Sequence, residues 1–370
     1  MYGTTVGPMS LTFDVHPNPD PASAEQRAAI LADPGFGKHF SDHMATATWT
    51  VDGGWADAKV VPYAPVGGNP ASAVFHYAQE VFEGLKAYRH EDGSVWLFRP
   101  DQNARRMINS AERLALPPLP EEDFLAGIET LVRVDREWVP AAVGEESLYL
   151  RPFLVAFEDF LGVRPARTVK YFCIASPAGP YFASGVKPVD IFISRAYTRA
   201  APGGTGAAKC GGNYAASLVA QREADAYGCS QVLFLDAAES RYVEEFGGMN
   251  CFVITSDGVL HTPQLTGSIL PGVTRSSILQ LAADHGLSAV EERIDVGWML
   301  DAITSGEITE VFACGTAAVV NPVRSFRDGE RVVTVGDGTS GERTMRIRRA
   351  LLDIQYGRAE DTHGWLRRVL

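Results

Sequence analysis

The sequence predicts a mixed α/β (α+β) fold of two domains. Its 370 residues are enough for two domains, and 46% of them are hydrophobic, which is typical of a globular chain. β-Forming runs flank Asp-Gly turns in the first half, whereas strands alternate with helical segments in the second half. A loop at 176–189 is rich in Pro and Gly and separates the halves. We therefore expect an N-terminal extension at 1–35, a small α/β domain at 36–182 and a larger domain at 183–370.

The N-terminal residues to about 30 are rich in Pro and Asp, so we expect them to wrap loosely over the surface, with order beginning near Phe36. Asp101 is expected to cap the first long helix. The predicted elements of the small domain are hairpins of 47–51 with 59–63 and of 85–90 with 95–99, helices at 101–114 and 121–138, and strands at 148–155 and 169–174.

The larger domain is expected to mix strands and helices without a simple βαβ repeat. Gly228 would end the helix that follows the longest glycine-rich loop. The predicted strands are 189–194, 231–235, 251–255, 259–262 and 309–313, and the predicted helices are 213–227, 273–285 and 341–355.

Composition narrows the function classes. The net charge of −12, from 45 acidic and 33 basic side chains, disfavours nucleic acid or an anionic membrane as the main partner. The five cysteines are odd in number and never spaced as Cys-x-x-Cys, which indicates neither a disulfide framework nor a metal site. No apolar run reaches about 18 residues and no signal peptide is evident. We expect a soluble, cytoplasmic enzyme that acts on small molecules.

The most unusual stretch is the loop at 199–214, in which Lys209 lies between two glycine-rich runs. Its five glycines would let the backbone adopt positive φ and approach a ligand closely. A Walker loop requires Gly-Lys-Ser/Thr, but Ala208 precedes Lys209 and Cys210 follows it, and a dinucleotide fingerprint requires glycine at the lysine position. Two interpretations stay open: a surface turn with a solvated lysine, or a confined lysine that forms a Schiff base with an aldehyde.

Four further stretches are unusual for purely structural sequence. They are 79–88 (QEVFEGLKAY), 98–107 (FRPDQNARRM), 244–250 (EEFGGMN), and 269–275 (ILPGVTR) together with 314–317 (CGTA). With KCGGNY at 209–214, and in this order, they resemble the branched-chain aminotransferases, class IV enzymes of fold type IV that use pyridoxal 5′-phosphate. The resemblance runs from about Phe36 to the C-terminal helix. It implies a fold type IV architecture whose larger domain is β-barrel-like.

The resemblance also implies a role for each motif around the cofactor's aldehyde, ring and phosphate. Lys209 matches the Schiff-base lysine, which also moves a proton between substrate and cofactor. Glu245 matches the partner of the ring nitrogen, although Glu244 is an alternative on the residues alone. Tyr214 matches the residue that hydrogen-bonds the ring hydroxyl. The residues that match the phosphate site are Arg106, Val273, Thr274 and Thr316, with two backbone amides at a helix N-terminus.

Each of these residues also has an ordinary structural interpretation. Glu245 could be a solvated loop acid, Tyr214 a core aromatic, and Arg106 a surface residue of a helix. The aromatic residues of the implied substrate pocket could equally be core.

The substrate pocket implied by the resemblance must hold a branched apolar side chain and then the side-chain carboxylate of glutamate. Its matches are Phe36, Tyr77, Phe82, Tyr149, Val163 and Tyr181. Arg151 lies two residues after Tyr149 on one strand, hence on the same face, and matches the residue that meets the glutamate carboxylate. Backbone amides at Thr316 and Ala317 would bind the α-carboxylate. The resemblance implies that Tyr77 and Val163 are contributed to this pocket across the interface of a homodimer.

The implied activity is the transfer of the amino group of L-leucine, L-isoleucine or L-valine to 2-oxoglutarate, by a ping-pong route that gives L-glutamate. Two rivals share the cofactor: D-amino acid aminotransferase and 4-amino-4-deoxychorismate lyase. A third rival, from another class, is a nucleotide-binding module built on the glycines from Gly203 to Gly212.

Overall fold

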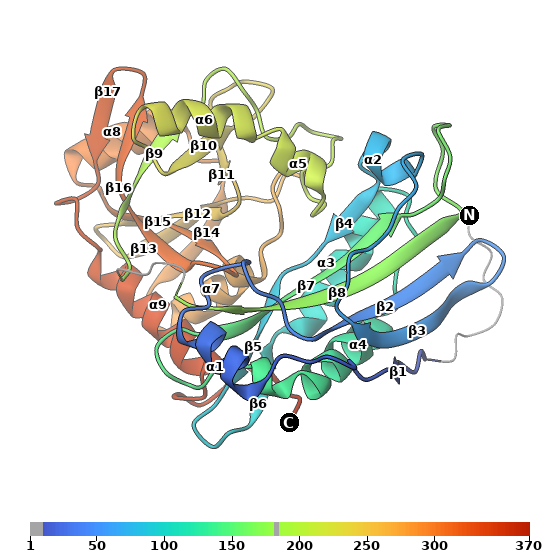
Figure 1. Cartoon of the computed structure of the whole chain (residues 1–370). Coiled ribbons are helices and arrows are strands. Elements are labelled where there is room, and N and C mark those ends of the chain that lie inside the picture. Colours follow the sequence, from blue (N-terminus) through green and yellow to red (C-terminus); the bar gives the residue numbers. More distant parts are fainter. Residues whose placement is uncertain (1–9, 181–184) are drawn as a thin grey trace.

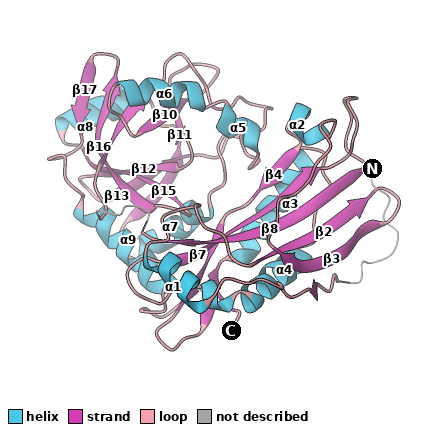
Figure 2. Cartoon of the chain, viewed as in Figure 1, coloured by secondary structure: helices cyan, strands magenta, loops and turns pink. Residues whose placement is uncertain are grey.

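The computed structural model describes residues 10–180 and 185–370. Its strands form two sheets of nine strands each, which lie beside one another with helices packed against both (Figures 1 and 2). The expected mixed α/β fold is confirmed.

The first sheet contains all the described strands of the first half and is mainly antiparallel. Its strand order is β1-β3-β2-β8-β7-β5-β6-β18, and β4 pairs with β7. The strands are β1 (Asp14–Val15), β2 (His43–Thr50), β3 (Gly54–Pro62), β4 (Glu80–Phe82), β5 (Leu85–Arg89), β6 (Val95–Phe98), β7 (Ser147–Ala156), β8 (Thr168–Ala178) and β18 (Leu366–Arg368). The predicted hairpins are present as β2–β3 and β5–β6.

The second sheet closes on itself. Strands β11-β10-β9-β16-β15-β12 are paired in this order and β11 also pairs with β12, so that these six strands form the barrel that fold type IV implies. The strands are β9 (Val189–Ile193), β10 (Gln231–Leu235), β11 (Val243–Phe246), β12 (Asn250–Thr255), β13 (Val259–Pro263), β14 (Ser288–Glu292), β15 (Ile308–Gly315), β16 (Val319–Asp328) and β17 (Arg331–Thr334).

The helices pack against both sheets. They are α1 (Ala24–Ala32), α2 (Ala73–Tyr77), α3 (Pro100–Arg113), α4 (Glu121–Val134), a 3₁₀ turn at Arg136–Trp138, α5 (Gly211–Ala215), α6 (Leu218–Ala226), α7 (Val273–Asp284), α8 (Val296–Ser305) and α9 (Glu342–Gln355). Buried side chains of α3 and α4 share a core with the first sheet, and those of α8 share one with the barrel.

A third core joins the two halves. Tyr88 and Phe98 of the first sheet are buried in the same cluster as Ile278 of α7 and Leu351 of α9. Burial of this much apolar surface fixes how the halves sit against each other. The division of the chain at residue 182 remains a prediction, and one strand departs from it, because β18 returns from the C-terminus to pair with β6 of the first sheet.

Two local expectations about helices were wrong. Asp101 does not cap α3: the cap residue is Arg99, in the left-handed conformation (φ 47°), and Pro100 is the first helical residue, where its missing N–H costs nothing. The single helix expected at 213–227 is two, because the chain departs from helical hydrogen bonding between α5 and α6. Helix α8 was not expected; its signal was Asp295, which accepts hydrogen bonds from two first-turn amides.

Order begins well before Phe36, contrary to the expectation of a loose N-terminus. Strand β1 pairs with β3, and α1 begins with a complete capping box formed by Ser23 and Gln26. Phe13 is only 6% exposed and belongs to the core of the first sheet, with its ring edge-on to Tyr171. The high content of Pro and Asp suggested a loose segment, but one aromatic side chain, Phe13, docks it on the core.

Replacing Phe13 by Ala should lower the free energy of unfolding by about 3 kcal/mol, because removing a buried aromatic side chain leaves a cavity. The measurement is denaturant unfolding followed by circular dichroism. Val15→Ala is the matched control, since Val15 is 48% exposed and should change stability by less than about 0.5 kcal/mol. Equal midpoints for Phe13→Ala and wild type would show that this segment does not dock in solution.

Candidate functional site

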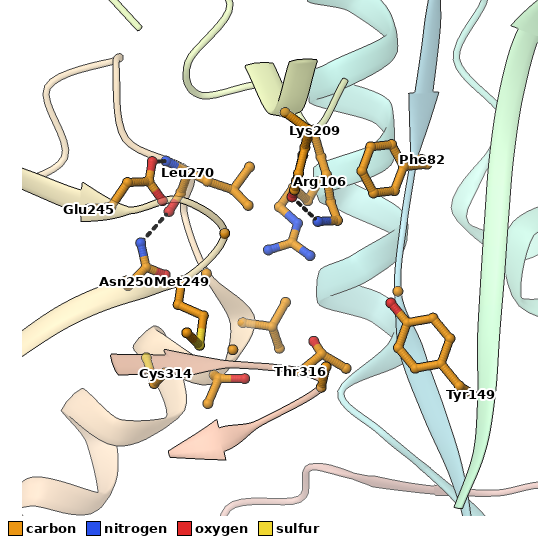
Figure 3. Close-up of a pocket in the computed structure, with 18 of the residues that line it drawn as sticks. Phe82, Arg106, Tyr149, Lys209, Glu245, Met249, Asn250, Leu270, Cys314 and Thr316 are labelled. Carbon is orange, nitrogen blue, oxygen red and sulfur yellow. Dashed lines mark hydrogen bonds between the residues drawn. The ribbon is translucent and has the colours of Figure 1, made fainter. Parts of the chain in front are cut away.

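A cavity of about 220 Å³ is lined by residues from both halves of the chain (Figure 3). It brings together most of the predicted site: Phe36, Phe82, Arg106, Tyr149, Arg151, Lys209, Tyr214, Glu245, Val273, Thr274, Thr316 and Ala317. Tyr77 and Val163 do not line it, and Tyr181 lies outside the described residues.

Lys209 enters this cavity from the loop ahead of α5. First-half residues hold its backbone: its amide donates to Ser110 Oγ (2.9 Å), and its carbonyl accepts from the Phe82 amide (3.0 Å). Its Nζ donates to the Tyr214 hydroxyl (2.6 Å) and lies 4.5 Å from the centre of the Phe82 ring. Burial, together with the nearby charge of Arg106, lowers the pKa of Lys209 to about 8. About a tenth of the amine is therefore neutral at pH 7, far more than for an ordinary lysine. The buried amine shows that the solvated-turn interpretation is wrong.

The glycines around Lys209 do less for backbone freedom than expected. Of the five glycines, only Gly203 has positive φ (76°). Gly206 is needed for close approach instead, since a Cβ there would collide with the backbone carbonyl of Ser268. The loop therefore approaches another segment of the same chain closely, where the sequence had suggested close approach to a ligand.

Glu245, not Glu244, faces the cavity. The two are neighbours on β11 and so point to opposite faces of the strand. Glu245 Oε1 accepts from Arg199 and from the Leu270 amide (2.8 Å), whereas Glu244 accepts from Ser268 and does not line the cavity. Among the described residues, Glu245 Oε2 has no hydrogen-bond donor. Burial raises the pKa of Glu245 to about 7, against the opposing effect of Arg199.

Arg106 is buried, although its place in the middle of a helix suggested a surface residue. It is 7% exposed and donates from Nε and Nη2 to the two carboxylate oxygens of Glu83 (2.7 and 2.8 Å). Asn103 also donates to Glu83 (2.8 Å), and Arg106 Nη1 reaches the carbonyl of Pro271 (3.2 Å). A bidentate pair fixes the guanidinium plane at the start of α7.

The N-terminus of α7 lies at this end of the cavity. Its cap residue, Gly272, offers no side-chain acceptor, so the first-turn amides of Val273 and Thr274 are free to bind an anion. The preceding turn is clamped by Asn250, which donates to the carbonyl of Leu270 (3.0 Å). A Cβ at residue 272 would collide with Asn250, which explains the glycine.

The wall formed by the first sheet is aromatic and includes one half-buried cation, Arg151. Phe36 packs edge-on against Tyr149 (5.1 Å between ring centres), and Phe82 lies against Tyr214 at the same separation. The Arg151 guanidinium lies 4.9 Å from the centre of the Phe82 ring and donates to the Tyr149 hydroxyl (3.1 Å). Its Nε is buried without a partner in the described part of the chain. This wall can pack apolar groups and still offers donors to a carboxylate.

Thr316 and Ala317 form the turn between β15 and β16 at another edge of the cavity (Figure 3). Tyr77 and Val163 instead lie on the surface, 40% and 85% exposed. The Tyr77 hydroxyl donates to the carbonyl of Leu161, so this tyrosine is held beside the 160–163 loop.

The residues that sequence reasoning missed support those it found. Glu83 and Asn103 hold Arg106, Arg199 pairs with Glu245, and Asn250 fixes the α7 turn. Glu83, Asn103 and Asn250 lay inside the recognised motifs, but their partners are distant in sequence, so no local spacing could pair them.

Two other possibilities find no support in the described residues. They contain no group of three or more His, Cys, Asp or Glu side chains placed to hold a metal ion. No described helix is long and apolar enough to cross a membrane.

Comparison with known proteins gives one family. The family model for amino-transferase class IV matches residues 80–326. A branched-chain-amino-acid aminotransferase of Mycolicibacterium smegmatis is 54% identical over 362 residues, 97% of this chain and 98% of that one. The solved branched-chain amino acid aminotransferase of Escherichia coli matches with TM-score 0.72 and 31% identity, over 88% of this chain and 100% of that one. The T.th. enzyme of the same name, complexed with N-(5′-phosphopyridoxyl)-L-glutamate, matches with TM-score 0.72 and 30% identity, over 88% of this chain and 99% of that one.

The reactivity of Lys209 toward an aldehyde should rise with pH. Only the neutral amine is nucleophilic, and because the pKa is about 8 its fraction increases as pH rises through that value. We expect the rate at which cofactor-free protein takes up pyridoxal 5′-phosphate, followed by absorbance, to increase about tenfold from pH 7 and to level off above the pKa. Lys209→Ala should show no such spectral change. A midpoint near the 10.4 of an ordinary lysine would contradict the buried-amine geometry.

Proposed function

This chain belongs to the class IV aminotransferases and, within them, to the branched-chain-amino-acid aminotransferases, and we propose that it exchanges the amino group of L-leucine, L-isoleucine or L-valine with 2-oxoglutarate. The products are the branched 2-oxo acids and L-glutamate. The observation that carries this proposal is one cavity that holds a buried amine, Lys209, and a buried carboxylate, Glu245, beside a helix N-terminus free to bind an anion.

The cofactor of this family is pyridoxal 5′-phosphate, which supplies an aldehyde that accepts the amino group and a ring that withdraws electrons from the substrate. The residues present fit it. The α7 amides and Arg106 suit the phosphate, Glu245 Oε2 suits the ring nitrogen, and the Tyr214 hydroxyl suits the ring oxygen. Lys209 suits the aldehyde.

Each residue has its own task in the proposed reaction. Lys209 would hold the cofactor through its Nζ, and the same amine would remove the proton from the Cα of the bound amino acid. Burial keeps that amine neutral enough to act as a base. Glu245 would keep the ring nitrogen of the cofactor protonated, and Arg199 helps to keep Glu245 ionised by opposing the effect of burial on its pKa. Tyr214 fixes the direction of the Lys209 amine.

One pocket must accept two unlike side chains. The rings of Phe36, Phe82 and Tyr149 offer apolar surface for a branched side chain. Arg151 lies over this same surface and has a hydrogen-bond donor without a partner among the described residues, which suits the side-chain carboxylate of glutamate. Amides of the Thr316–Ala317 turn would bind the α-carboxylate that both substrates share.

The proposal includes a homodimer. Apolar side chains gather on α2 and the 160–163 loop, where Phe75 is 63% exposed, Leu161 60% and Val163 85%, and a second copy would bury them. Tyr77 and Val163 would then complete the partner's substrate pocket. Sedimentation at the mass of a single chain would contradict this arrangement.

A cytoplasmic location is also part of the proposal. All five cysteines are free and buried, as expected for a chain in a reducing compartment. Recovery of the native protein in an exported fraction would count against it.

Substrate profiling tests the function directly. With 2-oxoglutarate as acceptor, we expect turnover of L-leucine, L-isoleucine and L-valine and none of D-alanine, since the aromatic wall suits branched apolar side chains. Turnover of D-alanine would favour a D-amino acid aminotransferase. Release of pyruvate from 4-amino-4-deoxychorismate would favour the lyase. ATP or NAD binding that survives Lys209→Ala, without cofactor, would favour a nucleotide-binding module.

Replacing Glu245 by Gln should lower kcat about 100-fold while the cofactor stays bound, because a neutral amide cannot keep the ring nitrogen protonated. The measurements are steady-state turnover of L-leucine and the absorbance of bound cofactor. Glu244→Gln is the matched control, since the neighbouring carboxylate points to Ser268 and should be nearly silent in kcat. The reverse order of effects would assign the ring nitrogen to Glu244.

A further inference from the structure

Two buried cations contact the back of the turn between β15 and β16. Lys86, on β5 of the first sheet, is 7% exposed and donates from Nζ to the carbonyl of Ala317 (3.1 Å). Arg348, on α9, is 2% exposed and donates from Nη1 to the carbonyls of Ala318 (2.7 Å) and Val320 (2.9 Å). The turn is thus held by one residue from each half of the chain.

The two cations are not equally neutralised. Arg348 forms an ion pair with Glu145, whereas no carboxylate of the described residues lies within ion-pairing distance of Lys86. The charged and titratable groups that act on Lys86 are Glu145 and Arg348, and burial lowers the pKa of Lys86 to about 8. An ammonium buried without a direct counter-ion is costly, so its retention calls for a compensating interaction.

A small cavity of about 20 Å³ lies beside Lys86. It is also lined by Gln355, Thr274 and Thr316, and the last two residues line the large cavity as well. Gln355 is 4% exposed, and its Oε1 has no partner among the described residues. A space of this size can hold one water molecule, which would accept a hydrogen bond from Lys86 Nζ and donate one to Gln355 Oε1. Lys86 and Gln355 therefore border a small space whose other lining residues include Thr274 and Thr316 of the large-cavity wall.

We propose that Lys86 is a positioning residue: its ammonium, held behind the 315–318 turn, orders that turn and supplies positive charge that favours binding of a substrate's α-carboxylate. This inference rests on the proposed function. Lys86 does not line the large cavity, so it acts through Ala317 and its neighbours. Both substrates carry an α-carboxylate, so both should depend on Lys86 alike, whereas Arg151 should matter for only one of them.

The test compares holoenzymes of wild type, Lys86→Met and Lys86→Gln. For Lys86→Met we expect KM to rise about tenfold for both L-leucine and 2-oxoglutarate, as for loss of a charge-assisted hydrogen bond, with kcat changed less than about threefold. The dissociation constant of 4-methylvaleric acid, which has a carboxylate and no amino group, should rise by the same factor. Lys59→Met is the matched control, because Lys59 is a partly exposed lysine paired with Asp57 and should change none of these values.

An unchanged KM and 4-methylvaleric acid affinity in Lys86→Met, or a fall in kcat alone, would overturn the inference. If Lys86→Met loses the absorbance of bound cofactor or its cooperative thermal unfolding, Lys86→Gln is judged by the same criteria, since it retains a hydrogen-bond donor and loses only the charge. If wild type does not turn over L-leucine, the proposed function is wrong, and the ratio of 4-methylvaleric acid dissociation constants still decides the role of Lys86.

Discussion

The burial of the Lys209 amine is the constraint on which the site depends. Water must be kept from it to lower its pKa, yet the amine must stay open to a ligand, and neither half of the chain achieves this alone. Ser110 and Phe82 hold the lysine backbone from the first half, while Tyr214 orients its amine from the second. The core that joins α7 and α9 to the first sheet therefore also holds together the two halves that enclose the lysine.

Buried ion pairs fix the orientation of two other charged side chains of the cavity, Arg106 and Glu245. Buried ion pairs seldom add stability, because the cost of desolvation offsets their attraction, but breaking one leaves an uncompensated buried charge. Glu83 and Glu245 each bind a buried arginine and thereby fix its orientation. Glu83 uses both oxygens on Arg106, whereas Glu245 gives one oxygen to Arg199 and leaves the other to the cavity. The Glu83 pair thus orients Arg106, whereas the Arg199 pair leaves one oxygen of Glu245 available to a ligand in the cavity.

Local signals in the sequence were enough for much of the fold, whereas most residues of the cavity were predicted through the resemblance of the motifs to a known family. The hairpins around Asp-Gly turns and four of the six barrel strands were predicted from nearby residues, whereas β11 and β16 were not, and Lys209 and Tyr214 are five residues apart. Contacts between distant residues were not predictable. Arg106 is buried in the middle of a helix because it pairs with Glu83, which is distant in sequence. Phe13 orders the N-terminal segment by packing on the core, although the composition of that segment suggested a loose chain. Lys86 lay inside a recognised motif, but its contact with Ala317 spans the two halves.

The cavity divides its tasks between the two halves of the chain. The second half offers backbone amides at two places, the N-terminus of α7 and the Thr316–Ala317 turn. In the proposed function the first would bind the cofactor phosphate and the second the α-carboxylate that both substrates share. The first half contributes Phe82, Tyr149 and Arg151, which suit the side chain that differs between substrates. Backbone amides change little when side chains are replaced. Substitutions in the first sheet can therefore alter which amino acid is accepted while the reaction on its α-amino group is preserved.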